Sequence, residues 1–121
     1  MTLDEHRLEV INKGDNYNVI KQCIDTSLDE LYDFIEALKV ENDTKSAESL
    51  EQMVEILEDL RKKYLNHTLT SKELESISIL LDMRTRVLIK KADQLVAAVE
   101  QITDLRDEYA NYTPEITVLK N

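Results

Sequence analysis

The side chains in this sequence that are spaced for chemistry are carboxylates. Asp33 and Glu36 lie three residues apart in one apolar-periodic segment, and Glu55 and Glu58 have the same spacing in the next. Residues three apart lie on one face of a helix, so each pair presents two carboxylates on the same side of its helix. Spaced carboxylates of this kind in an all-helical chain make an enzymatic function one hypothesis.

This arrangement resembles the paired carboxylates of the all-α nucleoside-triphosphate pyrophosphohydrolases, which hold magnesium through E-x-x-E and E-x-x-D motifs for pyrophosphate release. The match covers four residues, with Asp and Glu exchanged at Asp33 and Glu58. The resemblance implies a magnesium site, but all four carboxylates project away from the apolar stripes of their helices. We therefore rank a pyrophosphohydrolase-like protein third among three functions, and we predict no catalytic, cofactor-binding or metal-binding residue.

Other kinds of catalytic or binding site have little support in the sequence. His6 and His67 have no Cys or second His at ligand spacing, and the single Gly excludes a Gly-rich phosphate loop. The lone Cys23 is expected to act as a small buried hydrophobic residue. The basic clusters at 61–63 and 84–91 lack interleaved aromatic residues, so in a chain of net charge −10 we expect no direct nucleic-acid binding.

Composition predicts an all-α protein, a small helical bundle. The chain has 121 residues with one Gly and one Pro, too few turn formers for a sheet protein and enough residues for one buried core. The acidic N-terminus does not match a secretory signal, and no apolar run reaches the roughly 18–20 residues of a membrane span. We expect one helical domain over 1–112, an extended or flexible tail over 113–121, no membrane association and a cytoplasmic location.

Two capping boxes predict where the first and last helices begin. Thr2 with Glu5 opens a short helix over about 3–13, and Thr70 with Glu73 opens the last helix. No Gly or Pro interrupts the last helix for about 40 residues. At about 1.5 Å per residue it should be roughly 60 Å long, well beyond the two helices before it.

The two middle helices are predicted to form an antiparallel hairpin joined by a short polar loop. The second helix should begin at Asn16 or Asn18 and end near residue 40, and the third should span about 47–66. A further capping box at Ser27 and Glu30 could break the second helix, but we favour one helix because its apolar stripe continues. The stripes are Ile20, Ile24, Leu28, Leu31, Ile35 and Leu38 in the second helix, and Leu50, Met53, Leu57, Leu60 and Tyr64 in the third.

The last helix carries apolar residues at alternating spacings of three and four, as coiled-coil seams do. Two cations occupy positions of this stripe, Arg84 and Lys91, and their stems could cover the core while their charges reach the acidic hairpin. Residues 77–89 are apolar nearly all round, which indicates either the central helix of a bundle or an intermolecular interface. The predicted oligomer or packing seam comprises Leu81, Arg84, Leu88, Lys91 and Leu95.

The hairpin is strongly acidic. Residues 25–60 contain twelve acidic and two basic side chains, and most of the acids lie opposite the apolar stripes. Such a surface attracts basic proteins and speeds their encounter. The candidate partner-binding residues are Asp29, Asp33, Glu36, Glu48, Glu51, Glu55 and Glu58.

Two non-enzymatic functions follow from these patterns. The first is a protein–protein interaction module, such as an adaptor, inhibitor, chaperone-like or immunity-type factor, which binds a basic protein through the acidic hairpin. The second is a structural or assembly subunit that oligomerises through its long helix, with a homodimer favoured. Neither function requires a cofactor.

Overall fold

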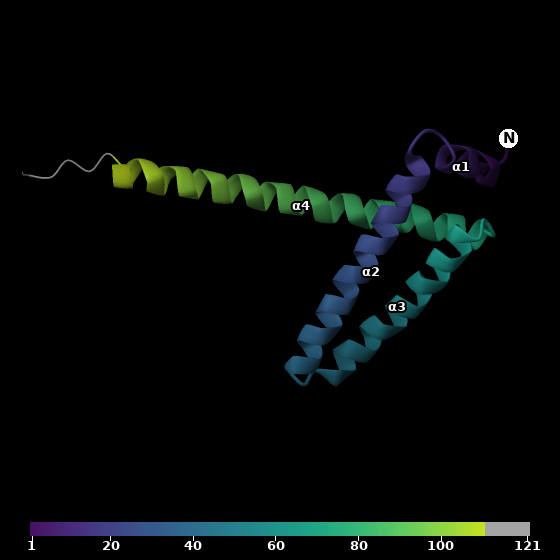
Figure 1. Cartoon of the computed structure of the whole chain (residues 1–121), viewed down its shortest axis with the longest axis horizontal. Coiled ribbons are helices and arrows are strands. Elements are labelled where there is room, and N and C mark those ends of the chain that lie inside the picture. Colours follow the sequence, from purple (N-terminus) through teal and green to yellow (C-terminus); the bar gives the residue numbers. More distant parts are fainter. Residues whose placement is uncertain (111–121) are drawn as a thin grey trace, which may run out of the picture. The chain divides into compact units, whose positions relative to one another are not determined.

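The computed structural model describes the backbone of residues 1–110 and the side chains of residues 1–108. Four helices occur in this part of the chain, α1 (Leu3–Ile11), α2 (Asn16–Val40), α3 (Thr44–Leu65) and α4 (Ser71–Ala110) (Figure 1). The expected all-α class and the long last helix are confirmed. The chain divides into two units, residues 1–85 and the part that begins at residue 86. The predicted tail over 113–121 lies outside the described residues.

The ends of α1 and α2 follow local hydrogen bonding. The Glu5 backbone N–H donates to Thr2 Oγ1 at 3.1 Å, so the first predicted cap is present. Asp15, not an asparagine, holds the N-cap position of α2, and its side chain makes no capping bond. Asn16 instead donates from Nδ2 to the Val10 carbonyl at 2.7 Å, which ties the start of α2 to α1. The helix then continues through Ser27 without a break.

The third helix begins three residues earlier than expected. Asp43 is its N-cap, and the Asp43 carboxylate accepts a hydrogen bond from the Ser46 backbone N–H at 3.2 Å. Asn42, with a φ of 61°, supplies the left-handed turn that reverses the chain. At the other end, Asn66 is the C-cap and His67 has a φ of 56°, so the predicted end of this helix is confirmed.

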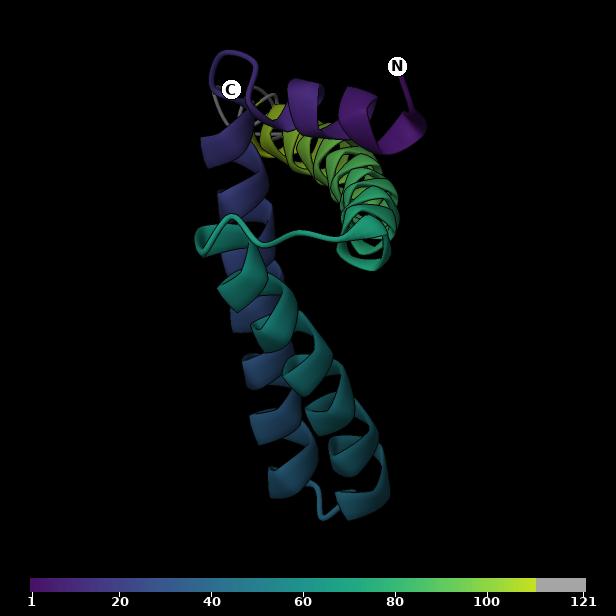
Figure 2. The same ribbon diagram turned by 90° about the vertical axis from the view of Figure 1, so that its right-hand side faces the viewer.

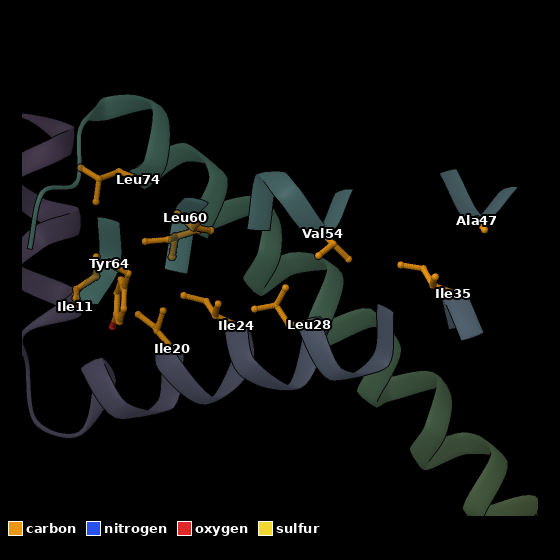
Figure 3. Packing of buried hydrophobic residues seen from close by; sticks show 11 residues of the cluster. Ile11, Ile20, Ile24, Leu28, Ile35, Ala47, Val54, Leu60, Tyr64 and Leu74 are labelled. Carbon is orange, nitrogen blue, oxygen red and sulfur yellow. The ribbon is translucent and has the colours of Figure 1, made fainter. Parts of the chain in front are cut away.

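Helices α2 and α3 pack antiparallel and enclose the core (Figures 1 and 3). Ile24 of α2 is completely buried, and Tyr64 of α3 is buried among Ile11, Ile20 and Leu74 at the open end of the hairpin (Figure 3). The α2 stripe lies in or against this core as predicted. The buried side of α3 differs from the predicted stripe, because Met53 is exposed whereas Ala47 and Val54 are buried.

Helix α1 and the start of α4 close the open end of the hairpin (Figure 2). Leu74 and Ile77 of α4 are buried in the core beside Ile11 of α1. An ion pair of 2.9 Å joins Arg7 of α1 to Glu75 of α4, and the Ser71 hydroxyl hydrogen-bonds to Asp4. The unit of residues 1–85 therefore contains a hydrophobic core built from all four helices.

Candidate interaction surfaces

The C-terminal segment of α4, residues 86–108, exposes large apolar side chains. Leu95, Val99 and Ile102 are 66%, 62% and 64% exposed, and Leu88 is 50% exposed. No side chain in this segment is buried, and Thr103 alone is half-buried. Exposed apolar residues are ordinary on a protein when they are scattered singly. Their arrangement around the helix therefore decides whether they form one continuous apolar surface.

Leu88, Leu95, Val99 and Ile102 gather on one side of the helix, and the exposed residues Val87, Ile89, Val96 and Leu105 lie at its flanks, about 80–100° from its centre. At 3.6 residues per turn, Leu88, Ala92, Leu95, Val99 and Ile102 fall within about 80° of the helix circumference. We call these five residues the α4 apolar face. The opposite side is polar and carries Arg86, Lys90, Asp93, Glu100 and Asp104. Residues 86–108 therefore form an amphipathic helix whose apolar face is open.

The predicted seam is divided between two roles. Leu81 packs against the core, and Arg84 Nη1 lies 2.9 Å from both carboxylate oxygens of Glu30 on α2. These two residues join α4 to the hairpin within the unit of residues 1–85. Leu88, Lys91 and Leu95 are exposed. Lys91 lies at the edge of the α4 apolar face, about 60° from its centre.

The predicted acidic residues do not form one continuous surface. Asp29, Asp33 and Glu36 are exposed on α2, and Glu48 and Glu55 are exposed on α3. Each set lies opposite the residues through which the two helices pack on each other, so the two sets occupy opposite outer edges of the hairpin.

Two further acids of the predicted set lie on α3 and contact side chains of α2. Glu51 forms an ion pair of 2.9 Å with Lys39, and Glu58 accepts a hydrogen bond of 2.9 Å from the Tyr32 hydroxyl. The hydrogen bond to Glu58 raises the pKa of Tyr32. These contacts link α2 to α3 across one side of the hairpin.

The carboxylate pairs that resemble a magnesium site are also separated. Asp33 and Glu36 lie on the α2 edge, whereas Glu55 lies on the α3 edge and Glu58 is bound to Tyr32. Among residues 1–108, no group of three or more His, Cys, Asp or Glu side chains is placed to hold a metal ion.

One buried carboxylate has a structural role that the sequence predicted only in part. Glu73 is 5% exposed, and its Oε1 lies 2.6 Å from Lys63 Nζ. Its other oxygen accepts from the Thr70 backbone N–H at 3.0 Å, which is the bond that Glu73 contributes to the predicted capping box. The hydrogen bonds from Lys63 and then Thr70 lower the pKa of Glu73 to about 2, and the bond to Glu73 raises the pKa of Lys63. Lys63 thus joins the end of α3 to the start of α4.

Two apolar features of the unit of residues 1–85 were not anticipated from the sequence. Phe34 of α2 and Ile56 of α3 are exposed, outside the stripes that signalled the core. A shallow groove of about 220 Å³ lies between α1, α2 and α4. It is lined by His6, Arg7, Val10, Ile11, Ile20, Leu74, Ile77, Ser78 and Leu81. The position of α1 against α4 creates this groove, and sequence periodicity does not specify that position.

Comparisons with known proteins add no family to this description. No protein-family model, no curated protein and no solved structure matches the chain. None of the helices in the described part is both long enough and apolar enough to cross a membrane. The surfaces themselves are the basis for a functional proposal.

Proposed function

We propose that this protein is a protein-binding and assembly module that docks through the α4 apolar face. The observation that supports this proposal is that Leu88, Leu95, Val99 and Ile102 share one side of α4 and are each at least half exposed. Contiguous exposed apolar patches are uncommon on monomeric proteins and mark interaction sites. An amphipathic helix of this kind binds either a groove on another protein or another helix.

The energetics of the helix favour a partner. Fully burying one Leu or Ile side chain contributes about 1.5–3 kcal/mol of free energy. A partner that covers four such residues would therefore gain several times the free energy that one of them contributes. Short helices are marginal in water, and most of their stability comes from packing an apolar face. A partner on residues 86–108 would therefore bind the segment and stabilise its helix at once.

A second candidate surface is the acidic hairpin, with a basic protein as its partner. Asp29, Asp33 and Glu36 on one edge, and Glu48 and Glu55 on the other, are exposed and could contact basic side chains. Binding of this kind would weaken as salt increases. We rank it second because each edge offers only two or three of the acids.

Site-specific photocrosslinking in the source cells tests both surfaces. The photoreactive amino acid benzoylphenylalanine would replace Leu95 on the apolar face, Ala97 on the polar side of the same helix, or Glu55 on the hairpin. We expect a covalent protein adduct at position 95 and none at the matched control position 97. An adduct at position 55 alone would replace the apolar face with the acidic edge as the docking surface. No adduct at position 95 would contradict docking through the apolar face, and no adduct at position 55 would contradict docking through the α3 edge of the hairpin.

A further inference from the structure

We infer that the α4 apolar face binds the same face of a second copy of this chain, with the two helices antiparallel. This inference rests on the proposed function and adds the identity and orientation of the partner. Three features of residues 86–108 support it: the distribution of charge along the helix, the sizes of the side chains on the apolar face, and the length of that face.

Charge is distributed unequally along the segment. Residues 86–92 contain three basic side chains and no acid, whereas residues 93–108 contain five acids and one base. Two parallel copies would place the basic ends together and the acidic ends together. Antiparallel copies place each basic end beside an acidic end of the second copy. Charge complementarity therefore selects the antiparallel orientation.

Side-chain size selects the same orientation. When Leu95 lies opposite Val99 of the second copy, Ala92 lies opposite Ile102 of that copy, so a small residue meets a large one. In this register Leu88 meets Arg106, whose aliphatic stem can cover it while the guanidinium reaches water. Parallel copies would instead pair Ala92 with Ala92 and Arg106 with Arg106, which leaves a gap in one layer and like charges in another.

The face is long enough for a helix pair and uses all of its positions in this register. The α4 apolar face and Arg106, which continues it by one turn, together provide six positions that cover nearly three heptads, or roughly 28 Å. This is close to the three heptads that are the shortest length typical of a coiled coil. Each of the six positions from one copy meets one of the six from the other. A second copy thus covers the whole face without any further partner.

Disulfide trapping of purified full-length protein tests the orientation. Cys23→Ala removes the native thiol, and Ala92→Cys and Ile102→Cys are made separately in that background, with tags of different mass. In the antiparallel pair, position 92 faces position 102, whereas the two copies of position 92 are about 15 Å apart, too far for a disulfide. We expect a mixed disulfide between the two variants in a glutathione redox buffer and no disulfide within either variant alone.

Sedimentation equilibrium of the full-length protein tests the pairing itself. We expect twice the monomer mass at tens of micromolar protein, at least a tenfold weaker dimer for Leu95→Glu, and an unchanged dimer for the matched control Ala97→Glu. Disulfides within each single variant, without the mixed product, would show a parallel pair and overturn the inference. A monomer up to about 100 µM would also overturn it. In that case, a crosslinked adduct between α4 and a different protein would still support the proposed function, with that protein as the partner.

Discussion

Arg84 of α4 and Glu30 of α2 form an ion pair in which Arg84 Nη1 lies 2.9 Å from both oxygens of the Glu30 carboxylate. The Arg84 side chain is only 13% exposed, so its stem is packed while its charge is bound by the hairpin. Arg84 stands at a stripe position where the flanking residues are leucines. A leucine there would pack as well, but it would not fix a particular residue of α2 opposite α4. We infer that the pair sets the position of the start of α4, residues 71–85, on the hairpin.

Removing this guanidinium should destabilise the protein. We expect Arg84→Ala to lower the free energy of unfolding by about 1–2 kcal/mol, because the half-buried ion pair with Glu30 is lost. Lys72→Ala removes the same charge from an exposed position of α4 and should change the free energy by less than about 0.5 kcal/mol. Urea unfolding of the two variants compares these losses. Equal stability of Arg84→Ala and the wild type would show that the pair contributes nothing.

Stability should depend on acid through Glu73. Its pKa is lowered from 4.5 to about 2 in the folded state, so its contribution is complete above about pH 4.5 and is lost as the pH falls towards 2. We expect Glu73→Gln to be less stable than the wild type at pH 6, and the difference between them to shrink steadily from pH 4.5 to pH 2. Urea unfolding of both proteins at each pH measures that difference. The other carboxylates are present in both proteins, so their titration does not contribute to it. A difference that does not vary with pH would contradict the assignment.

The Tyr64 hydroxyl should contribute to stability independently of its ring. The ring stacks on Tyr17 with centroids 4.7 Å apart, and the hydroxyl donates to the Tyr17 carbonyl at 2.8 Å in the core. Tyr64→Phe keeps the ring and leaves that carbonyl without this donor, which should cost about 1–2 kcal/mol. Tyr32→Phe removes an exposed hydroxyl and should cost less. Thermal and urea unfolding compare the two, and an equal loss would show that burial of the bond adds nothing.

Much of the fold follows from the sequence alone, because helix formation depends on local signals. The spacing of Ile24, Leu28 and Ile35 predicted α2 and the side of it that is buried. The capping residues Thr2 and Thr70 predicted two helix starts. The start of α3 was placed too late because Asp43, which caps it, was assigned to the polar loop.

The candidate surface was predicted in part. The predicted seam includes Leu88 and Leu95, but its alternating spacing of three and four residues also places Lys91 in it. An α-helix of 3.6 residues per turn rotates about 20° for each heptad, so the apolar side drifts towards Ala92 and Val99 by the end of α4. Of the predicted acids, Asp29, Asp33, Glu36, Glu48 and Glu55 are exposed, whereas Glu51 and Glu58 contact α2, so which acids share an edge depends on how α2 and α3 pack.

The sequence by itself determined which segments are helical and which side of each helix is apolar, since both depend on residues within a few turns of one another. Only the tertiary structure decided which apolar positions are covered. Leu74 and Leu95 occupy the same heptad position, but Leu74 is 3% exposed and Leu95 is 66% exposed. The bond between Lys63 and Glu73 was likewise decided by the path from α3 to α4. Burial and pairing depend on which segments meet in space, and periodicity along one helix does not contain that information.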